Sequence, residues 1–166
     1  MVHLRDIDPR NDSEITLVAE RMRATLLEVE GDVLYTMEWL VDRVRWHLDE
    51  ARRARVVLGI DDAGAIAGHT IFRVEQDEDA QTFGLVSTSY VMPAARRLGF
   101  ASAFLQEAER WFRERQLPLA ATWTSSTNTS LIALYARHGF TEDRRGPNDL
   151  TGTMMVRLAK MLDDPL

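Results

Sequence analysis

Residues 91–112, VMPAARRLGFASAFLQEAERWF, place two arginines and a glycine directly before a strongly amphipathic stretch. No acidic residue occurs in this stretch before Glu107, although the chain has a formal net charge of -6. Pro93 ends the apolar run at its start, so the order predicts a strand, a tight turn and then a helix. Unpaired backbone N–H groups and the positive end of the helix dipole meet at such a turn, where phosphate groups bind. We therefore expect an anion at this helix start.

The residues of the turn suit an anion site. Gly99 lets the backbone approach a ligand closely, and the small Ala101 and Ser102 leave the same surface open. Arg96 and Arg97 add charged hydrogen-bond donors. The alternative interpretation is an ordinary helix start with two solvated arginines and a turn glycine, and the spacing alone favours it. Other phosphate motifs fit worse, because the chain has neither GxxxxGK[ST] nor GxGxxG after a strand.

Composition narrows the class of protein. The chain has 166 residues, of which 45% are hydrophobic and 28% charged, which predicts one globular domain over residues 1–166. It has no cysteine, and its first residues carry charges where a signal peptide needs an apolar run. No run of about 18 apolar residues occurs. The calculated pI near 5.2 argues against nucleic-acid binding. We expect a cytoplasmic protein with neither membrane nor nucleic acid as a partner.

Apolar periodicity alternates between strand and helix patterns along the chain. Ser13 is expected to cap the first helix and Gly139 to close the last, while the acidic residues 75–80 form a loop. The predicted helices are 13–29, 33–48, 99–116 and 128–138, and the predicted strands are 2–8, 56–60, 65–74, 82–92, 119–125, 140–144 and 152–161. This order favours a mixed α/β domain with helices on the faces of a sheet.

Two patterns in the chain resemble the signatures of the GNAT superfamily of acyl-CoA-dependent N-acetyltransferases. The first, V-x-P-x-x-R-x-x-G-x-A, resembles the acyl-CoA loop and is carried by Val91, Pro93, Arg96, Gly99 and Ala101. The second, N-x-x-[A]-x-x-[L]-Y-x-x-x-G-F, is carried by Asn128, Leu134, Tyr135, Gly139 and Phe140, with Leu131 in place of the alanine. The element order also matches along essentially the whole chain. The resemblance implies an α/β (α+β) GNAT-like domain with a mixed, mostly antiparallel central sheet and helices on both faces.

The resemblance implies acetyl-CoA as the cosubstrate. It assigns the CoA diphosphate to the backbone amides of the turn and of the first helical turn, which points to Arg96, Arg97, Gly99, Ala101 and Ser102. Val91 is expected to pair its backbone with the pantetheine arm, provided that strands 82–92 and 119–125 diverge. Asn128 is expected beside the same arm, with a role as helix N-cap as its alternative. No metal is expected, because none of the four histidines has a partner at metal-ligand spacing.

Tyr135 is the catalytic candidate. Its helical spacing with Leu131, Leu134 and His138 favours a core position, and His138 is expected to be structural. The family, however, places this tyrosine hydroxyl near the thioester sulfur, which implies a general acid. The implied activity is acetyl transfer from acetyl-CoA to a primary amine by direct attack in a ternary complex. A non-catalytic acyl-CoA-binding module is the alternative, and a dinucleotide oxidoreductase is poorly supported.

The base that deprotonates the amine stays open. Strand 82–92 carries no carboxylate, so the alternatives are water held by Ser87 and Ser89, a side chain from elsewhere, or a weakly basic amine. The side chains considered for this role are Glu38, Glu75 and His47.

The acceptor is also open, as a small-molecule or peptide amine. Aromatic residues that can form its wall are Tyr35, Trp39, Trp46 and Trp123, most of which are more simply core residues. An acidic stretch, Glu75 to Asp79, is either a solvated turn or an attraction for cationic amines, which favours weakly a small cationic or aromatic acceptor. Relatives are commonly homodimers, and the sequence leaves the oligomeric state open.

Overall fold

The computed structural model describes residues 2–30 and 35–162. The helices there are α1 (Asp12–Glu30), α2 (Met37–Leu48), α3 (Phe100–Glu114) and α4 (Thr129–Arg137), with short 3-10 turns η1 (Glu50–Arg52) and η2 (Pro93–Ala95). The strands are β1 (His3–Asp6), β2 (Ala54–Ile60), β3 (Ile66–Gln76), β4 (Thr82–Val91), β5 (Leu119–Ser125), β6 (Thr141–Pro147) and β7 (Met154–Met161).

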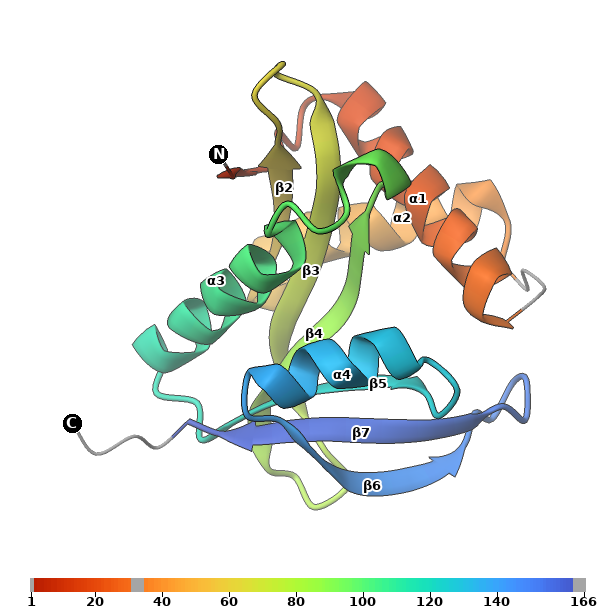
Figure 1. Ribbon diagram of the computed structural model, residues 1–166, viewed down its shortest axis with the longest axis vertical. Coiled ribbons are helices and arrows are strands. Elements are labelled where there is room, and N and C mark those ends of the chain that lie inside the picture. The colour runs from red at the N-terminus through yellow and green to blue at the C-terminus, as the bar shows by residue number, and fades with distance from the viewer. Residues whose placement is uncertain (1, 31–34, 163–166) are drawn as a thin grey trace.

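These strands form one seven-stranded sheet with the order β1-β2-β3-β4-β5-β7-β6. Neighbouring strands are antiparallel, except for β4 and β5, which are parallel. In Figure 1, α3 and α4 lie in front of the sheet and α2 crosses behind β3. The predicted mixed, mostly antiparallel sheet with helices on both faces is therefore confirmed.

The alternation of side chains along β2 builds the two layers. Val56 and Leu58 pack with α1 and α2, through residues such as Ile15 and Val44. Val57 points to the other face and joins the cluster around α3 and α4. Because successive strand residues face opposite sides, an almost continuous apolar run such as β2 requires cover on both faces.

Glycine lets α3 approach the sheet closely. A Cβ atom at Gly84 would lie 2.4 Å from the ring of Phe112, and one at Gly59 would lie 2.7 Å from the ring of Phe100. Either contact is too short for real atoms, so these two positions need glycine for space. The aromatic stripe of α3 thereby seats directly on β2 and β4.

Strands β4 and β5 diverge after a short contact. They pair only through Gly84 with Ala120 and Leu85 with Ala121. Ser87 forms a bulge between the β3 pairs of Val86 and Thr88, and its hydroxyl donates to the Ile71 carbonyl at 3.2 Å. Figure 1 shows the two strands separating. The divergence on which the expected role of Val91 depends is therefore present, and it leaves the β5-facing edge of β4 beyond Leu85 without a strand partner among the described residues.

Two helix starts differ from the sequence prediction. Asn11, and not Ser13, caps α1, because the Asn11 Oδ1 accepts the Glu14 N–H at 3.1 Å. The helix predicted from residue 33 begins at Met37, where the Thr36 hydroxyl accepts the Trp39 N–H at 3.0 Å. Residues 31–34 of that prediction lie outside the described part of the chain. None of the described helices has the length and apolar character needed to cross a membrane.

Candidate active site

A cavity of about 880 Å³ opens beside the diverged end of β4. It is bounded by α1, the end of β4, the loop that follows η2, the start of α3, and α4. The structure brings all eight predicted site residues to this one cavity: Val91, Arg96, Arg97, Gly99, Ala101, Ser102, Asn128 and Tyr135 line it. The two signature patterns, which lie far apart in the sequence, thus share one wall.

The start of α3 presents free backbone donors to the cavity. Gly99 is the N-cap, with a φ of 96° and no side chain that caps the helix. The first intrahelical bond runs from the Ala103 N–H to the Gly99 carbonyl, so the N–H groups of residues 100–102 have no intrahelical acceptor. The first turn also contains no acidic residue. This arrangement favours an anion at the helix start.

Position 99 is a glycine because its backbone is left-handed, and not because a side chain there would clash with its neighbours. A Cβ atom at Gly99 would contact only Val2 at 3.8 Å, so its φ of 96° is the reason for glycine at this position. Arg97, two residues earlier, also has a positive φ, of 67°. Two left-handed residues in three make the sharp turn that aims the helix start at the cavity.

Arg96 connects this loop to β4 and α1. Its Nε donates to the Val91 carbonyl at 3.3 Å, and its guanidinium lies 3.8 Å from the Glu28 carboxylate. A ligand that pairs with the Val91 carbonyl must therefore share that acceptor or displace Arg96.

A second contact joins α3 to α4, where the Ser102 hydroxyl lies 3.1 Å from the His138 Nε2. This contact supports the structural role expected for His138.

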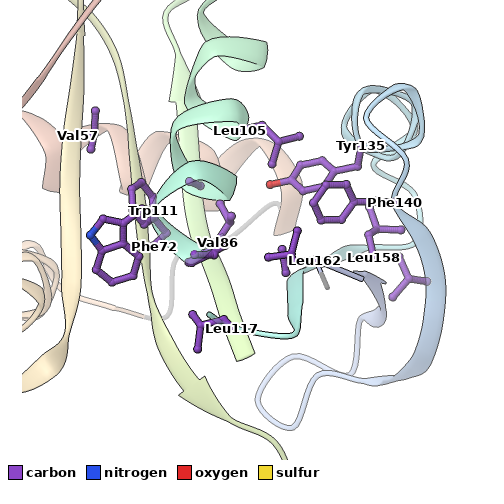
Figure 2. Close-up of a cluster of buried hydrophobic side chains, with 14 residues drawn as sticks. Val57, Phe72, Val86, Leu105, Trp111, Leu117, Tyr135, Phe140, Leu158 and Leu162 are labelled. Atoms are coloured by element: carbon purple, nitrogen blue, oxygen red, sulfur yellow. The ribbon is translucent and has the colours of Figure 1, made fainter. Parts of the chain in front are cut away.

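Tyr135 is a core residue that also lines the cavity. The side chain is only 3% exposed and belongs to the main apolar cluster, yet it lines the cavity. Figure 2 shows the ring pointing from α4 towards α3, with the hydroxyl beside Leu105. Burial raises the pKa of the phenol, against the opposing effect of the Thr122 hydroxyl. The group therefore stays protonated at neutral pH and is a hydrogen-bond donor.

Asn128 is both a cap and a cavity residue. Its Oδ1 accepts the Leu131 N–H at 3.4 Å, which makes it the N-cap of α4. Its Nδ2 donates to the Thr124 hydroxyl at 3.1 Å, which fixes the amide against β5. The two roles considered from the sequence therefore do not exclude one another.

The three side chains proposed as remote bases do not line the cavity. Glu38 lies on the exposed side of α2, and Glu75 pairs with Arg73 at 3.0 Å. His47 is buried between the Arg43 carbonyl and the Arg73 guanidinium, both at 2.9 Å, and burial lowers its pKa to about 4. Among the described lining residues the one carboxylate is Glu28.

Only one of the two serines proposed to hold water lines the cavity. Ser89 does so, with its hydroxyl 2.7 Å from that of Thr70. The Ser87 hydroxyl is used within the bulge of β4.

The four aromatic residues considered for the acceptor wall, Tyr35, Trp39, Trp46 and Trp123, do not line this cavity. Tyr35 and Trp39 stack on each other 4.2 Å apart, and the Arg43 guanidinium lies 3.9 Å from the Trp46 ring. Trp39 and Trp123 are also exposed rather than core residues.

The acidic stretch has a structural role. Asp77 accepts the N–H groups of Asp79 and Gln81 and pairs with Arg144 at 3.3 Å. It therefore closes the β3–β4 turn, and none of the acidic residues 75–79 lines the cavity.

Sequence reasoning missed several lining residues: Thr25 and Glu28 on α1, Tyr90 on β4, and Arg137 on α4. Tyr90 directly precedes Val91, so the strand pattern offered a signal for it. Thr25 and Glu28 offered none, because their place depends on how α1 crosses β4. The described residues contain no group of three or more His, Asp or Glu side chains arranged to hold a metal ion.

Comparisons with known proteins agree with this geometry. The model of the acetyltransferase (GNAT) family matches residues 20–140. No curated protein matches the sequence. The fold is similar to that of the protein yncA from Salmonella typhimurium, solved with its cofactor acetyl-CoA, with a TM-score of 0.75, 15% identity, and coverage of 100% of this chain and 96% of that one.

Two further structures have the same fold. A GNAT-family acetyltransferase from Streptococcus pneumoniae is 18% identical, with a TM-score of 0.71 and coverage of 97% of this chain and 99% of that one. The ribosomal-protein-alanine N-acetyltransferase of Brucella melitensis is 16% identical, with a TM-score of 0.74 and coverage of 96% and 99%.

Proposed function

The chain belongs to the acetyltransferase (GNAT) family, and on this premise we propose that it transfers the acetyl group of acetyl-CoA to a primary amine. The observation that carries the proposal is the convergence on one cavity of a helix start with free N–H groups, an unpaired strand edge and a buried tyrosine hydroxyl. Each of these features serves a different part of an acyl-CoA thioester.

The helix start and the strand edge are assigned to the cosubstrate. The N–H groups of residues 100–102 bind the diphosphate, together with the left-handed turn that ends at Gly99. Arg96, Arg97 and Arg137 also line the cavity and supply positive charge. The pantetheine arm pairs with β4 near Val91 and passes Asn128, as an added strand does at a sheet edge.

Tyr135 is assigned to the leaving group. The amine nitrogen attacks the thioester carbonyl carbon, and the C–S bond of the tetrahedral species then breaks with its electron pair on sulfur. The Tyr135 hydroxyl donates a proton to that thiolate, and the proton lost by the amine passes to water. Burial raises the pKa of the phenol, but it also disfavours a free thiolate in the same place. The difference between the pKa of the Tyr135 phenol and the pKa of the CoA thiol therefore changes less than either pKa does alone.

Amine deprotonation is assigned to water. An alkylamine with a pKa near 10.4 is neutral only about one time in a thousand at pH 7.4, so its proton must be removed before attack. Ser89 is the hydroxyl of β4 that lines the cavity, and it is held by Thr70. A water molecule bonded to Ser89 gives the proton a route to solvent.

Acetyl-CoA consumption, followed by the release of free CoA thiol, tests the proposal directly. The acceptors to compare are polyamines, aminoglycosides, amino acids, arylamines and peptides with a free N-terminus. Turnover of at least one amine supports the proposal. A protein that acetylates none of them, yet melts higher with acetyl-CoA, is instead an acyl-CoA-binding module. Saturation to 100 times the dissociation constant stabilises by about 2.7 kcal/mol, which is easily detected.

A further inference from the structure

The region where α1 packs near strands β3 and β4 contains buried polar atoms without hydrogen-bond partners. Both ring nitrogens of His69 and the Nη1 of Arg21 are buried and make no hydrogen bond. His69 pairs in register with Tyr90 on β4, and their rings lie 6.1 Å apart with an angle of 19°. The Arg21 guanidinium lies over the same Tyr90 ring, 5.4 Å from its centre. Since buried donors normally have partners, this cluster calls for a ligand or an internal water.

Arg21 is partly buried, and it differs from three other arginines that are buried or partly buried. Arg157, Arg55 and Arg73 each pair with at least one carboxylate, at 2.5, 2.6 and 3.0 Å. No ion pair of Arg21 occurs within the described residues, although burial is strong enough to lower its pKa. Burying one nitrogen of a guanidinium without a hydrogen-bond partner or a carboxylate is costly. The protein retains a charge here that its own side chains do not neutralise.

The cluster adjoins the proposed active site. Tyr90, whose ring is close to both Arg21 and His69, lines the cavity, and so does Thr25, one helical turn after Arg21. The Thr25 hydroxyl is already used, because it donates to the Arg21 carbonyl at 3.0 Å. Burial and the charge of Arg21 lower the pKa of His69 to about 3, so its imidazole is neutral and presents one N–H. Two donors of different kinds therefore lie next to the lining residue Tyr90, although neither Arg21 nor His69 itself lines the cavity.

We propose that Arg21, together with His69, binds a carboxylate of the acceptor, so that the acceptor is an amino acid or a similar amine that carries an anionic group. The proposal rests on the proposed function for its amine. A guanidinium offers paired N–H donors that match the two oxygens of a carboxylate. The aromatic face of Tyr90 excludes water from this contact, and the attraction between opposite charges is stronger where water is excluded. A cationic acceptor loses its support, because the acidic residues 75–79 are not at the cavity.

Matched acceptors test the proposal when the protein turns over. Each amino acid is paired with its own carboxamide, and kcat/KM is measured for both with the parent protein and with Arg21→Met. We expect the parent to prefer the acid at least 10-fold more than the variant does, with the acetyl-CoA KM unchanged. Comparing the two proteins cancels the intrinsic difference in amine pKa between the acid and the amide. An equal preference in both proteins overturns the proposal.

A binding measurement decides the case in which no amine is acetylated. N-acetylglycine carries the carboxylate without the amine, and N-acetylglycinamide is its neutral match. If only N-acetylglycine raises the Tm of the parent, and Arg21→Met abolishes the effect, the anion site stands while the proposed function fails. If neither compound acts and no amine turns over, both proposals fail. Acetylation of amines with no preference for acids defeats the anion site alone, and the cluster then holds an internal water only.

Stability separates ligand recognition from a structural role. Arg21→Met removes a partly buried charge without a carboxylate partner, so its Tm is expected to equal or exceed that of the parent. Arg157→Met is the control, because Arg157 is buried and is paired with Asp143. This control is expected to lower the Tm clearly. A comparable loss in Arg21→Met shows that Arg21 holds the fold together, which overturns its assignment to the acceptor.

Discussion

The ring of Tyr135 packs edge to face against that of Phe140, with centroids 4.9 Å apart and an angle of 77° between the planes. This contact ties α4 to the start of β6 and uses only the ring. The hydroxyl takes no part in it and lies beside Leu105, which also lines the cavity. Tyr135→Phe removes only the hydroxyl oxygen, so this substitution separates the packing role of the residue from its chemical role.

Tyr135→Phe is expected to lower kcat by about 10- to 1000-fold, because the leaving thiolate loses its proton donor. The Tm and the acetyl-CoA KM change little, since the ring contact with Phe140 is kept. Steady-state kinetics and a melting curve of the same preparation provide the check. A variant that melts much lower but turns over normally once folded shows that Tyr135 is only a core residue.

The raised pKa of Tyr135 predicts a specific pH profile. A raised pKa keeps the phenol protonated to higher pH than a free tyrosine, so the donor form is complete at every pH below about 10. Any basic limb in the kcat profile between pH 7 and 9 must then come from another group. We expect such a limb to persist, at reduced amplitude, in Tyr135→Phe. Its disappearance in that variant contradicts the assigned protonation state.

Gly99→Asp is expected to weaken CoA binding at least 10-fold more than Gly99→Asn. Both residues must adopt the left-handed φ of 96°, so backbone strain is nearly matched and the added charge differs. Gly64→Asp is the control for strain elsewhere, because Gly64 has a φ of 84° and open space around it. Calorimetry with CoA measures the three affinities. Equal affinity in the two Gly99 variants means that no phosphate lies at this helix start.

Substitutions at Asn128 are expected to separate its effect on stability from its effect on cosubstrate binding. Asn128→Ser keeps an N-cap oxygen, so the Tm stays near that of the parent, whereas Asn128→Ala loses about 1 kcal/mol of stability. Both variants lose the amide, and both are expected to raise the acetyl-CoA KM. If Asn128→Ser binds acetyl-CoA as the parent does, Asn128 is only a cap.

The lowered pKa of His47 predicts that the fold loses stability in acid. Its pKa of about 4 in the folded protein lies below the ordinary value of 6.5, so the unfolded chain binds the proton more readily. The stability from neutral His47 is present above pH 6.5 and is lost as the pH falls towards 4. Linkage gives a loss of about 2 kcal/mol between pH 7 and pH 5. In urea titrations, His47→Gln is expected to show a correspondingly smaller decrease, and an equal decrease contradicts the shifted pKa.

Sequence reasoning found the parts of the site that are local in the chain. The turn before α3 and the helix around Tyr135 each lie within about a dozen residues, and glycine, proline and helical spacing report directly on such geometry. It failed for the N-cap of α1, because Asn11 and Ser13 are both good N-cap residues. The choice depends on the position of Glu14, whose N–H bonds to Asn11 and whose carboxylate lies 2.7 Å from the Arg5 guanidinium. It also misplaced the tryptophans, since an aromatic residue at helical spacing does not reveal what it faces.

The order of elements, the α3 start without acidic residues and the presence of two signatures are properties of the sequence alone, because they depend on interactions between near neighbours. The distance between β4 and β5, the crossing of α1 over Tyr90 and the isolation of Arg21 and His69 were decided only by the tertiary structure. Arg21 and His69 are 48 positions apart and carry no shared periodicity. Their common surroundings arise because apolar faces of a helix and a sheet pack together, and that packing determines which polar atoms lose water.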